Sequence, residues 1–405
     1  MNEESLTRLL DWIVERGLAG DDEIALLQGF CARSVDAGLD LSRSVMIVDT
    51  LHPVHEGRAF FWRQDQKVET PVVEYGPSDQ GENLEEWKKS PFYHLLQSDE
   101  NEMRRRLCDG ETEGYSVFDD LKQEGQTDYL AMVHRFSRES VIGELDCILS
   151  RWTTARAGGF SEADIAALRR LVPVLCLAIK SASLARIAES LVEAYLGRDA
   201  GRRVLQGRMT RGAVEKINAV IWFSDMQGYT ALSERIESNQ LIPLLDDYAE
   251  IVISAVHGAG GDVLKLMADG ILAIFTADDP SGACLSALRA EADLRSRLNA
   301  LNGERAADNQ PTTSIHLGLH IGDVFYGNIG SKDRLDFTVV GQAVNEASRI
   351  ETMCRSAGRD VLFSSAFRDA LPEAERPKLV SVGRYALRGV GKAQELFTLD
   401  PELAG

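Results

Sequence analysis

VIWFSDMQGYTALSERI, residues Val220–Ile236, is the stretch that decides the fold of the C-terminal half of this chain. Apolar residues lead into Asp225, and a polar run with helical character follows Gly228. The pattern predicts a buried strand, a tight turn and a helix. The aspartate is compatible with a helix N-cap, or with a metal ligand beside a phosphate-binding turn. Taken alone, the stretch favours the cap, because caps are the more common feature.

The composition bounds the classes of partner. The chain has 405 residues, which is long for one domain, and 44% of them are hydrophobic, as in a globular protein. Asp and Glu outnumber Lys and Arg by 63 to 44, which gives a net charge of −19. We therefore expect neither a nucleic acid nor an anionic membrane as partner. A nucleotide can still bind where metal ions or local cations offset this charge.

Membrane and secretion signals are weak. No apolar run approaches the length of a membrane span, and the most apolar one, Leu171–Ile179, is bracketed by Arg170 and Lys180. The acidic, amphipathic N-terminus does not resemble a secretory signal. Six scattered cysteines without a CxxC pair predict neither a disulfide framework nor a structural zinc site. We expect a cytoplasmic protein with reduced thiols.

The N-terminal half has the pattern of a mixed α/β module. Helical patterns at Leu6–Val14 and Asp22–Val35 precede four strand-like segments. A helix within Gly158–Ile179 is expected to be kinked or interrupted at Pro173. A second helix, Ser183–Gly197, could pair with the same helix of a second protomer or pack on its own domain.

The C-terminal half has a β-α-α-β-β-α-β pattern. The Gly- and Arg-rich segment Gly197–Lys216 predicts a domain junction before it. Within Gly260–Phe275, an Asp-Gly pair predicts a hairpin turn between two strands. The order of elements predicts an α/β (α+β) sandwich with helices on one face of the sheet.

Two carboxylates are expected to meet at one edge of this sheet. Asp225 ends the first strand and Asp269 lies at the tip of the hairpin, so both could bind a pair of divalent cations. Asn345 and Arg349 are four residues apart and therefore share a helix face. Arg388 and the nearby Lys392 add positive charge. Carboxylates, an anion-binding turn and cations together suggest a nucleoside triphosphate.

Four blocks in this half resemble the class III nucleotidyl cyclase catalytic domain. They are FSDMQGYT, LKLMADG, GDVFYGNIG and DFTVVGQAVNEASRIE, and they occur in the order of that family between Val220 and Leu399. The resemblance implies a ferredoxin-like fold. Gly260–Val263 also reads GGDV, as in diguanylate cyclases, but the acidic residue that follows in that family is missing.

The resemblance implies a site for two metal ions. Asp225 and Asp269 match the metal-binding aspartates, and the backbone carbonyl of Met226 would help to hold one ion. Two Mg²⁺ or Mn²⁺ ions would activate the ribose 3′-hydroxyl and bind the triphosphate. The expected phosphate-binding turn consists of Gly228, Tyr229 and Thr230.

The resemblance also assigns the residues that contact the base, the ribose and the phosphates. Lys265 matches the purine-reading lysine and Thr338 its partner, and a lysine that donates to N1 of adenine favours ATP. Asn345 matches the ribose-positioning asparagine, and Arg349 matches the arginine that stabilises the transition state. Arg388 stands where the family has a lysine on the terminal phosphates, which changes the geometry of the contact.

Two further expectations concern the hairpin. Ala268 stands where the family usually has glycine, and alanine adopts a positive φ only at a cost. Lys265 and Asp269 belong to opposite sites of a head-to-tail pair in this family. The resemblance therefore implies a homodimer with two equivalent sites.

The segment GGFSEADIAALRRL, from Gly158 to Leu171, resembles the closing helix of GAF-type sensor domains. We therefore expect a GAF-like α/β sensor domain over residues 1–182, a helical signalling linker over 183–216 and a cyclase domain over 217–405. No cofactor is identifiable in the first domain, since a lone Cys31 or His94 is more often a core residue. The signal, a ligand or a protein, stays unknown. A guanylyl cyclase and a non-catalytic protein with the cyclase fold remain alternatives; Lys265 argues against the first, and the complete motif set against the second.

Overall fold

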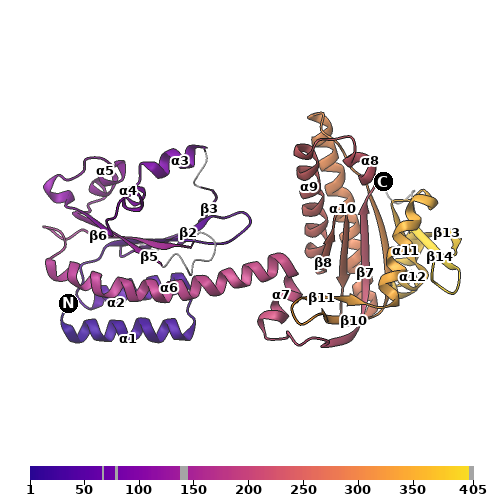
Figure 1. Ribbon diagram of the computed structural model, residues 1–405, viewed down its shortest axis with the longest axis horizontal. Helices are drawn as coiled ribbons and strands as arrows, with labels where there is room; N and C mark the ends of the chain where they lie inside the picture. The colour runs from indigo at the N-terminus through magenta and orange to yellow at the C-terminus, as the bar shows by residue number, and fades with distance from the viewer. Residues whose placement is uncertain (66–67, 78–80, 137–144, 401–405) are drawn as a thin grey trace. The chain divides into compact units, whose positions relative to one another are not determined.

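The chain divides into two compact units, Met1–Leu191 and Val192–Gly405. The computed structural model, drawn in Figure 1, describes residues 1–65, 68–77, 81–136 and 145–400. Residues 401–405, at the end of the expected cyclase domain, lie outside the described residues.

The N-terminal unit is a six-stranded antiparallel sheet between two layers of helices. Its strands are β1 (Arg43–Asp49), β2 (Gly57–Arg63), β3 (Val72–Tyr75), β4 (Glu102–Arg105), β5 (Asp128–Arg135) and β6 (Cys147–Thr154). Its helices are α1 (Glu3–Ala19), α2 (Glu23–Asp36), α3 (Gly81–Lys88), α4 (Pro91–Gln97), α5 (Ser116–Gln123) and α6 (Glu162–Leu196), the last of which runs on past Leu191. The strand order is β3-β2-β1-β6-β5-β4.

Alternating side chains give this sheet a core on each face. On β6, Ile148 and Trp152 pack with α1, α2 and α6, whereas Cys147 and Leu149 pack with α4 and α5. Figure 1 shows α3, α4 and α5 on one side of the sheet and α1, α2 and α6 on the other. Cys31 is fully buried in the core formed with α1, α2 and α6, where it belongs to a cluster of apolar side chains.

Helix α6 is one continuous helix where the sequence indicated two. The helix expected within Gly158–Ile179 and the helix expected over Ser183–Gly197 form one helix of 35 residues, which Pro173 does not interrupt. A proline inside a helix removes a hydrogen bond at a cost of about 3 kcal/mol. Leu171, Val172 and Leu175 are fully buried beside Pro173, and their packing offsets this cost.

The same helix bears on the expectation that no apolar run approaches the length of a membrane span. One 18-residue window of α6 has a mean hydropathy of 1.7, so the helix is long and apolar enough to cross a membrane by length and composition. In the sequence, Lys180 divides the apolar residues of this helix into two shorter runs. Of that window, 39% is buried, and a core helix of a globular domain can meet the same criteria.

The C-terminal unit is a second, eight-stranded sheet. Its strands are β7 (Val214–Met226), β8 (Asp262–Met267), β9 (Gly270–Phe275), β10 (Ile315–Gly330), β11 (Leu335–Val340), β12 (Val361–Ser364), β13 (Leu379–Tyr385) and β14 (Gln394–Leu399). The order is β13-β14-β12-β10-β7-β9-β8, with β11 paired to β10. The strands β10-β7-β9-β8 have the ferredoxin-like arrangement that the resemblance implies.

Helices cover both faces of this sheet, and the expectation of helices on one face is wrong. They are α7 (Arg198–Leu205), α8 (Tyr229–Ser233), α9 (Ser238–Gly258), α10 (Pro280–Ala307), α11 (Gln342–Ala357) and α12 (Ser365–Ala370). Val220 and Trp222 of β7 pack with α9 and α10, whereas Ile221 packs with Ala343 and Ala347 of α11. The continuous apolar run in β7 is the sequence sign of a strand buried on both faces.

The hairpin between β8 and β9 places an alanine in a left-handed conformation. Ala268 has φ of +54°, in the region where an L-residue other than glycine is strained. The adjacent Asp269 occupies the tip of the same turn.

We expect Ala268→Gly to raise the free energy of unfolding of the C-terminal unit by about 1 kcal/mol, because glycine adopts this φ without the steric cost. Urea unfolding followed by circular dichroism measures the change. Ala277, in the loop after β9, has no positive φ, so Ala277→Gly is the matched control and should give no gain. An equal effect of the two substitutions would contradict the strain.

Candidate functional site

The end of β7 and the β8–β9 turn bring the two expected metal ligands together. The strand ladder pairs Asp225 with Gly270. Asp269 precedes Gly270, and its carbonyl oxygen accepts a hydrogen bond of 3.1 Å from the Met226 amide. The backbone therefore holds both carboxylates at one edge of the sheet, and the cap interpretation of Asp225 fails, because Gly228 is the N-cap residue of α8.

Asp269 opposes the ionisation of Asp225. Burial, together with the negative charge and hydrogen bonding of Asp269, raises the pKa of Asp225 to about 6. A bound cation would remove this penalty, because it stabilises the charged form of both groups.

The donor set fits Mg²⁺ or Mn²⁺, which prefer oxygen ligands and commonly bind to one or two carboxylates plus substrate phosphates. In the part of the chain that the structure describes, no group of three or more His, Cys, Asp or Glu side chains forms a cage for a metal ion. The site is therefore open, and substrate and water would supply the remaining ligands.

Two buried groups near the aspartates were not identified from the sequence. Glu351 of α11 is 7% exposed, and burial together with the charges of Asp225 and Asp269 raises its pKa to about 7. The hydroxyl of Tyr248, on α9, is buried and has no hydrogen-bond partner among the described residues. Glu351 lies two positions after Arg349 in the motif helix, but its inward direction depends on how α11 packs on the sheet.

A second group of residues surrounds Lys265. Its ammonium forms an ion pair with Asp336 of β11, a residue that the sequence comparison did not single out. Thr338 is two residues further along β11, on the same face as Asp336, and is buried. The structure thus brings the expected purine-reading lysine to the strand that carries its expected partner.

A third group lies on α11. Asn345 and Arg349 are exposed on one side of the helix, while Ala343, Ala347 and Ile350 anchor the opposite side. Both polar side chains are therefore presented to solvent from a fixed helix, and no hydrogen bond or ion pair of either is recorded within the described ranges.

The expected phosphate contacts lie on exposed turns. Gly228 has φ of +74° and begins α8, which is only five residues long, so it aligns few amides. Tyr229 packs partly against the core, and the Thr230 carbonyl accepts a hydrogen bond from Ser233. Arg388 is exposed in the loop between β13 and β14.

Within one chain the three groups stay separate. Over residues 1–65, 68–77, 81–136 and 145–400, no hydrogen bond or ion pair joins the aspartate pair to the Lys265 group or to Asn345 and Arg349. The aspartate pair, the Lys265 group and the α11 pair are therefore three distinct groups within the described part of the C-terminal unit.

The raised pKa of Asp225 generates a pH-dependent prediction. A carboxyl group with a higher pKa in the folded than in the unfolded chain keeps its proton longer when folded, so its contribution to stability is lost as pH rises from about 4 to about 6. We expect Asp225→Asn, in chelator, to raise the Tm of the C-terminal unit by about 2–4 °C at pH 7 and by less at pH 5.

Calorimetry at the two pH values measures this difference, with millimolar Mn²⁺ as the second condition. The metal should stabilise only the unsubstituted chain and should reverse the ranking at pH 7. A gain that is the same at both pH values would refute the repulsion between Asp225 and Asp269.

Comparison with known proteins agrees with this geometry. Residues 213–400 match the family model of the adenylate and guanylate cyclase catalytic domain. An adenylate cyclase of Anabaena cylindrica is 35% identical over 159 residues, which cover 38% of this chain and 31% of that protein. Adenylate cyclase 1 of Rhizobium meliloti is 30% identical over 149 residues, 36% of this chain and 22% of that protein.

Among solved structures, a bacterial light-regulated adenylyl cyclase is 25% identical with a TM-score of 0.49, and the match covers 57% of this chain and 64% of that one. This chain spans about a third or less of the length of the two adenylate cyclases above. The matched segment contains the aspartate pair, the Lys265 group and the α11 pair. Residues 213–400 of this chain therefore belong to the family of adenylate and guanylate cyclase catalytic domains.

Proposed function

We propose that this chain is an adenylate cyclase, which converts ATP to 3′,5′-cyclic AMP and pyrophosphate at a site shared by two protomers. The observation that carries the proposal is the pair of carboxylates, Asp225 and Asp269, held side by side in a domain of the cyclase family. The two relatives named adenylate cyclases support ATP as the substrate.

In the proposed reaction the ribose 3′-oxygen forms a bond to the α-phosphorus and loses its proton, while the bond from the α-phosphorus to pyrophosphate breaks. Two Mg²⁺ or Mn²⁺ ions, when held by Asp225, Asp269 and the Met226 carbonyl, would acidify the hydroxyl and neutralise the triphosphate. Asn345 would orient the ribose, and Arg349 would stabilise charge on the transferred phosphoryl group. The remaining phosphate contacts would come from Arg388, Gly228, Tyr229 and Thr230.

A head-to-tail homodimer would join the groups that one chain keeps apart. The aspartate pair of one protomer would face the Lys265 group and α11 of its partner. Exposed apolar side chains at the ends of β8, β10 and β11 support such an interface, since their burial between protomers is favourable. They are Leu266, Met267, Phe325 and Val340.

Mixing two inactive variants tests the shared site. Asp225→Ala and Asn345→Ala should each lose more than nine-tenths of kcat, about 1.4 kcal/mol of transition-state stabilisation. A mixed dimer keeps one intact site, so mixing should restore activity. The matched control mixes Asp225→Ala with Asp269→Ala, which damage the same half and should not recover. No recovery in the first mixture, with subunit exchange proven, would refute the shared site.

The Lys265 group would select the base. Adenine presents an acceptor at N1 and a donor at its 6-amino group, and guanine presents the reverse at N1 and O6. Lys265 would donate to N1, and Thr338 would accept from the amino group. Asp336 would hold the lysine in place through the ion pair that the structure records.

Exchange of these groups should shift the base preference. Lys265→Glu with Thr338→Cys should raise the GTP share of kcat/KM about tenfold or more, because a mismatched buried pair costs about 1–3 kcal/mol. Asp336→Asn is added so that two carboxylates do not face each other, and Asp333→Asn replaces it in the control. Cyclic AMP and cyclic GMP are quantified after incubation with each nucleotide. An unchanged ratio in a folded, active variant would show that these residues do not choose the base.

The same assay separates the alternatives. Purified chain with Mg²⁺ or Mn²⁺ is given ATP or GTP, and the cyclic product is measured. A preference for GTP would indicate a guanylate cyclase, and no product from either would indicate a non-catalytic signalling protein.

Regulation by the N-terminal unit is the second part of the proposal. Helix α6 begins in the N-terminal unit and extends past its boundary at Leu191. A change in the N-terminal unit would therefore be transmitted to the C-terminal unit along this continuous helix. The three-part division into residues 1–182, 183–216 and 217–405, the GAF-like identity of the first part and a cytoplasmic location belong to this proposal.

A further inference from the structure

Four arginines gather on one face of the N-terminal sheet, in a unit that contains none of the groups in the proposed reaction. Arg43 of β1 lies directly opposite Arg63 of β2. Arg151 of β6 lies opposite Val45, two residue pairs from Arg43 along the β1–β6 ladder and therefore on the same face of the sheet. Arg105 of β4 lies opposite Tyr129 of β5, in the same cross-strand row as Arg43.

The strand alternation places all four on the face that α4 and α5 cover. Leu149 and Cys147 share the face of Arg151 and belong to the core beneath α4 and α5. Ile148 and Trp152 point to the opposite core. In Figure 1 this is the side of the sheet on which α3, α4 and α5 lie.

The cluster has too few anions for its charge. Glu124, next to the end of α5, forms ion pairs with both Arg43 and Arg63. Arg105 donates to the backbone carbonyl of Arg104. Arg151 has no ion pair or hydrogen bond recorded among the described residues, and its buried Nε is without a partner there. Within the described ranges, Glu124 is therefore the one carboxylate that pairs with these four arginines, and it pairs with Arg43 and Arg63 alone.

An excess of positive charge in a partly buried position lowers the stability of the folded protein. Burial lowers the pKa of Arg151, and the positive charges of Arg43 and Arg63 oppose its ionisation. Arginine nevertheless stays protonated in proteins, so the charge persists and is stabilised only by an anion. Like charges directly opposite on neighbouring strands, as at Arg43 and Arg63, are also destabilising.

We propose that Arg43, Arg63 and Arg151 form a binding site for a small organic anion that carries a carboxylate or phosphate group. The planar guanidinium fork matches both groups with two parallel hydrogen bonds. All three side chains keep partial exposure, so a ligand can reach them. Glu124 is 44% exposed and would compete with the ligand for Arg43 and Arg63.

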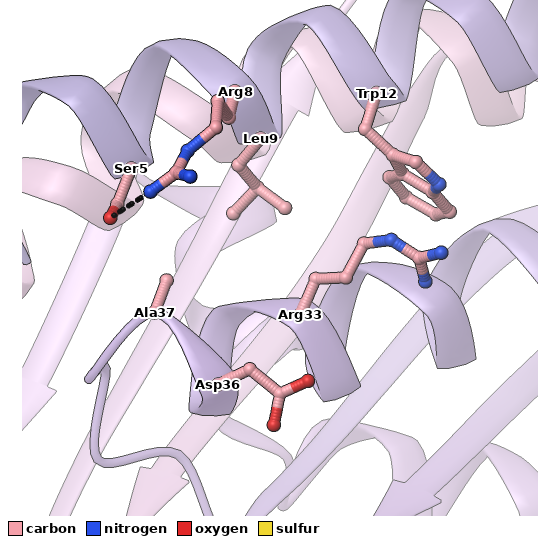
Figure 2. A pocket seen from close by; sticks show the side chains of 7 residues that line it. All are labelled: Ser5, Arg8, Leu9, Trp12, Arg33, Asp36 and Ala37. Atoms are coloured by element: carbon pink, nitrogen blue, oxygen red, sulfur yellow. Dashed lines mark hydrogen bonds between the residues drawn. The ribbon is translucent and has the colours of Figure 1, made fainter.

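A groove between α1 and α2 provides the contrast. Figure 2 shows Arg8, Trp12, Arg33 and Asp36 around this groove. Its arginines have partners: Arg33 stacks over the Trp12 ring at 4.5 Å, and Arg8 donates to Ser5. Arg33 is therefore a suitable control for the loss of one arginine from the same unit.

Titration calorimetry of the full chain, without nucleotide or divalent metal, tests the proposal. One arm uses succinate and citrate, the other inorganic phosphate and glucose 6-phosphate, and sodium chloride at equal ionic strength is the reference. We expect one arm to bind with one site per chain. Arg151→Met should weaken this binding at least about tenfold, because the central charge is lost, whereas Arg33→Met should leave it unchanged.

Glu124→Gln provides a test of opposite sign that does not depend on the folding of the Arg151 variant. Loss of the competing carboxylate should tighten anion binding about tenfold. No binding beyond chloride in either arm, or equal binding by the unsubstituted chain and Glu124→Gln, would overturn the site. Because no cyclase activity is measured, this outcome is independent of the proposed function of the C-terminal unit.

Discussion

The backbone of the C-terminal unit holds two carboxylates, Asp225 and Asp269, close together, and the packing of the rest of the unit must stabilise this arrangement. Neither side chain can relax away, because β7 is paired on both sides and the turn is fixed by the hydrogen bond from Met226 to Asp269. The fold therefore stabilises, through packing elsewhere, an arrangement that is unfavourable in itself. Burial and the charge of Asp269 raise the pKa of Asp225, and a cation bound by both carboxylates, as we propose, would offset this repulsion.

Burial of β7 on both faces supplies this stabilisation. Trp222 packs on the side of α9 and α10, and Ile221 packs on the side of α11. Tyr248 of α9 and Glu351 of α11 are both buried near the carboxylates, while Asn345 and Arg349 remain on the outer side of α11. One helix thus separates buried acidic groups from exposed polar groups that are available to a substrate.

The N-terminal unit also contains buried charged groups, of which some have hydrogen-bond and ion-pair partners and one has none among the described residues. Glu23 of α2 is satisfied, because Arg58 of β2 and Ser183 and Arg186 of α6 all donate to it. This cluster fixes the far end of α6 to its own unit. Arg43 and Arg63 instead share the carboxylate of Glu124, and Arg151 has no ion pair among the described residues, which distinguishes this cluster from the satisfied one around Glu23.

The sequence by itself determined the strand that ends near Asp225, the β8–β9 turn and the spacing of the motif residues, because these depend on local periodicity and turn chemistry. It also exposed the strain at Ala268, since a turn of this kind requires a positive φ. The continuity of α6 through Pro173, the position of α11 on the second face and the pairing of Lys265 with Asp336 were decided only by tertiary structure. Each depends on contacts between residues far apart in the chain, where packing outweighs local preference.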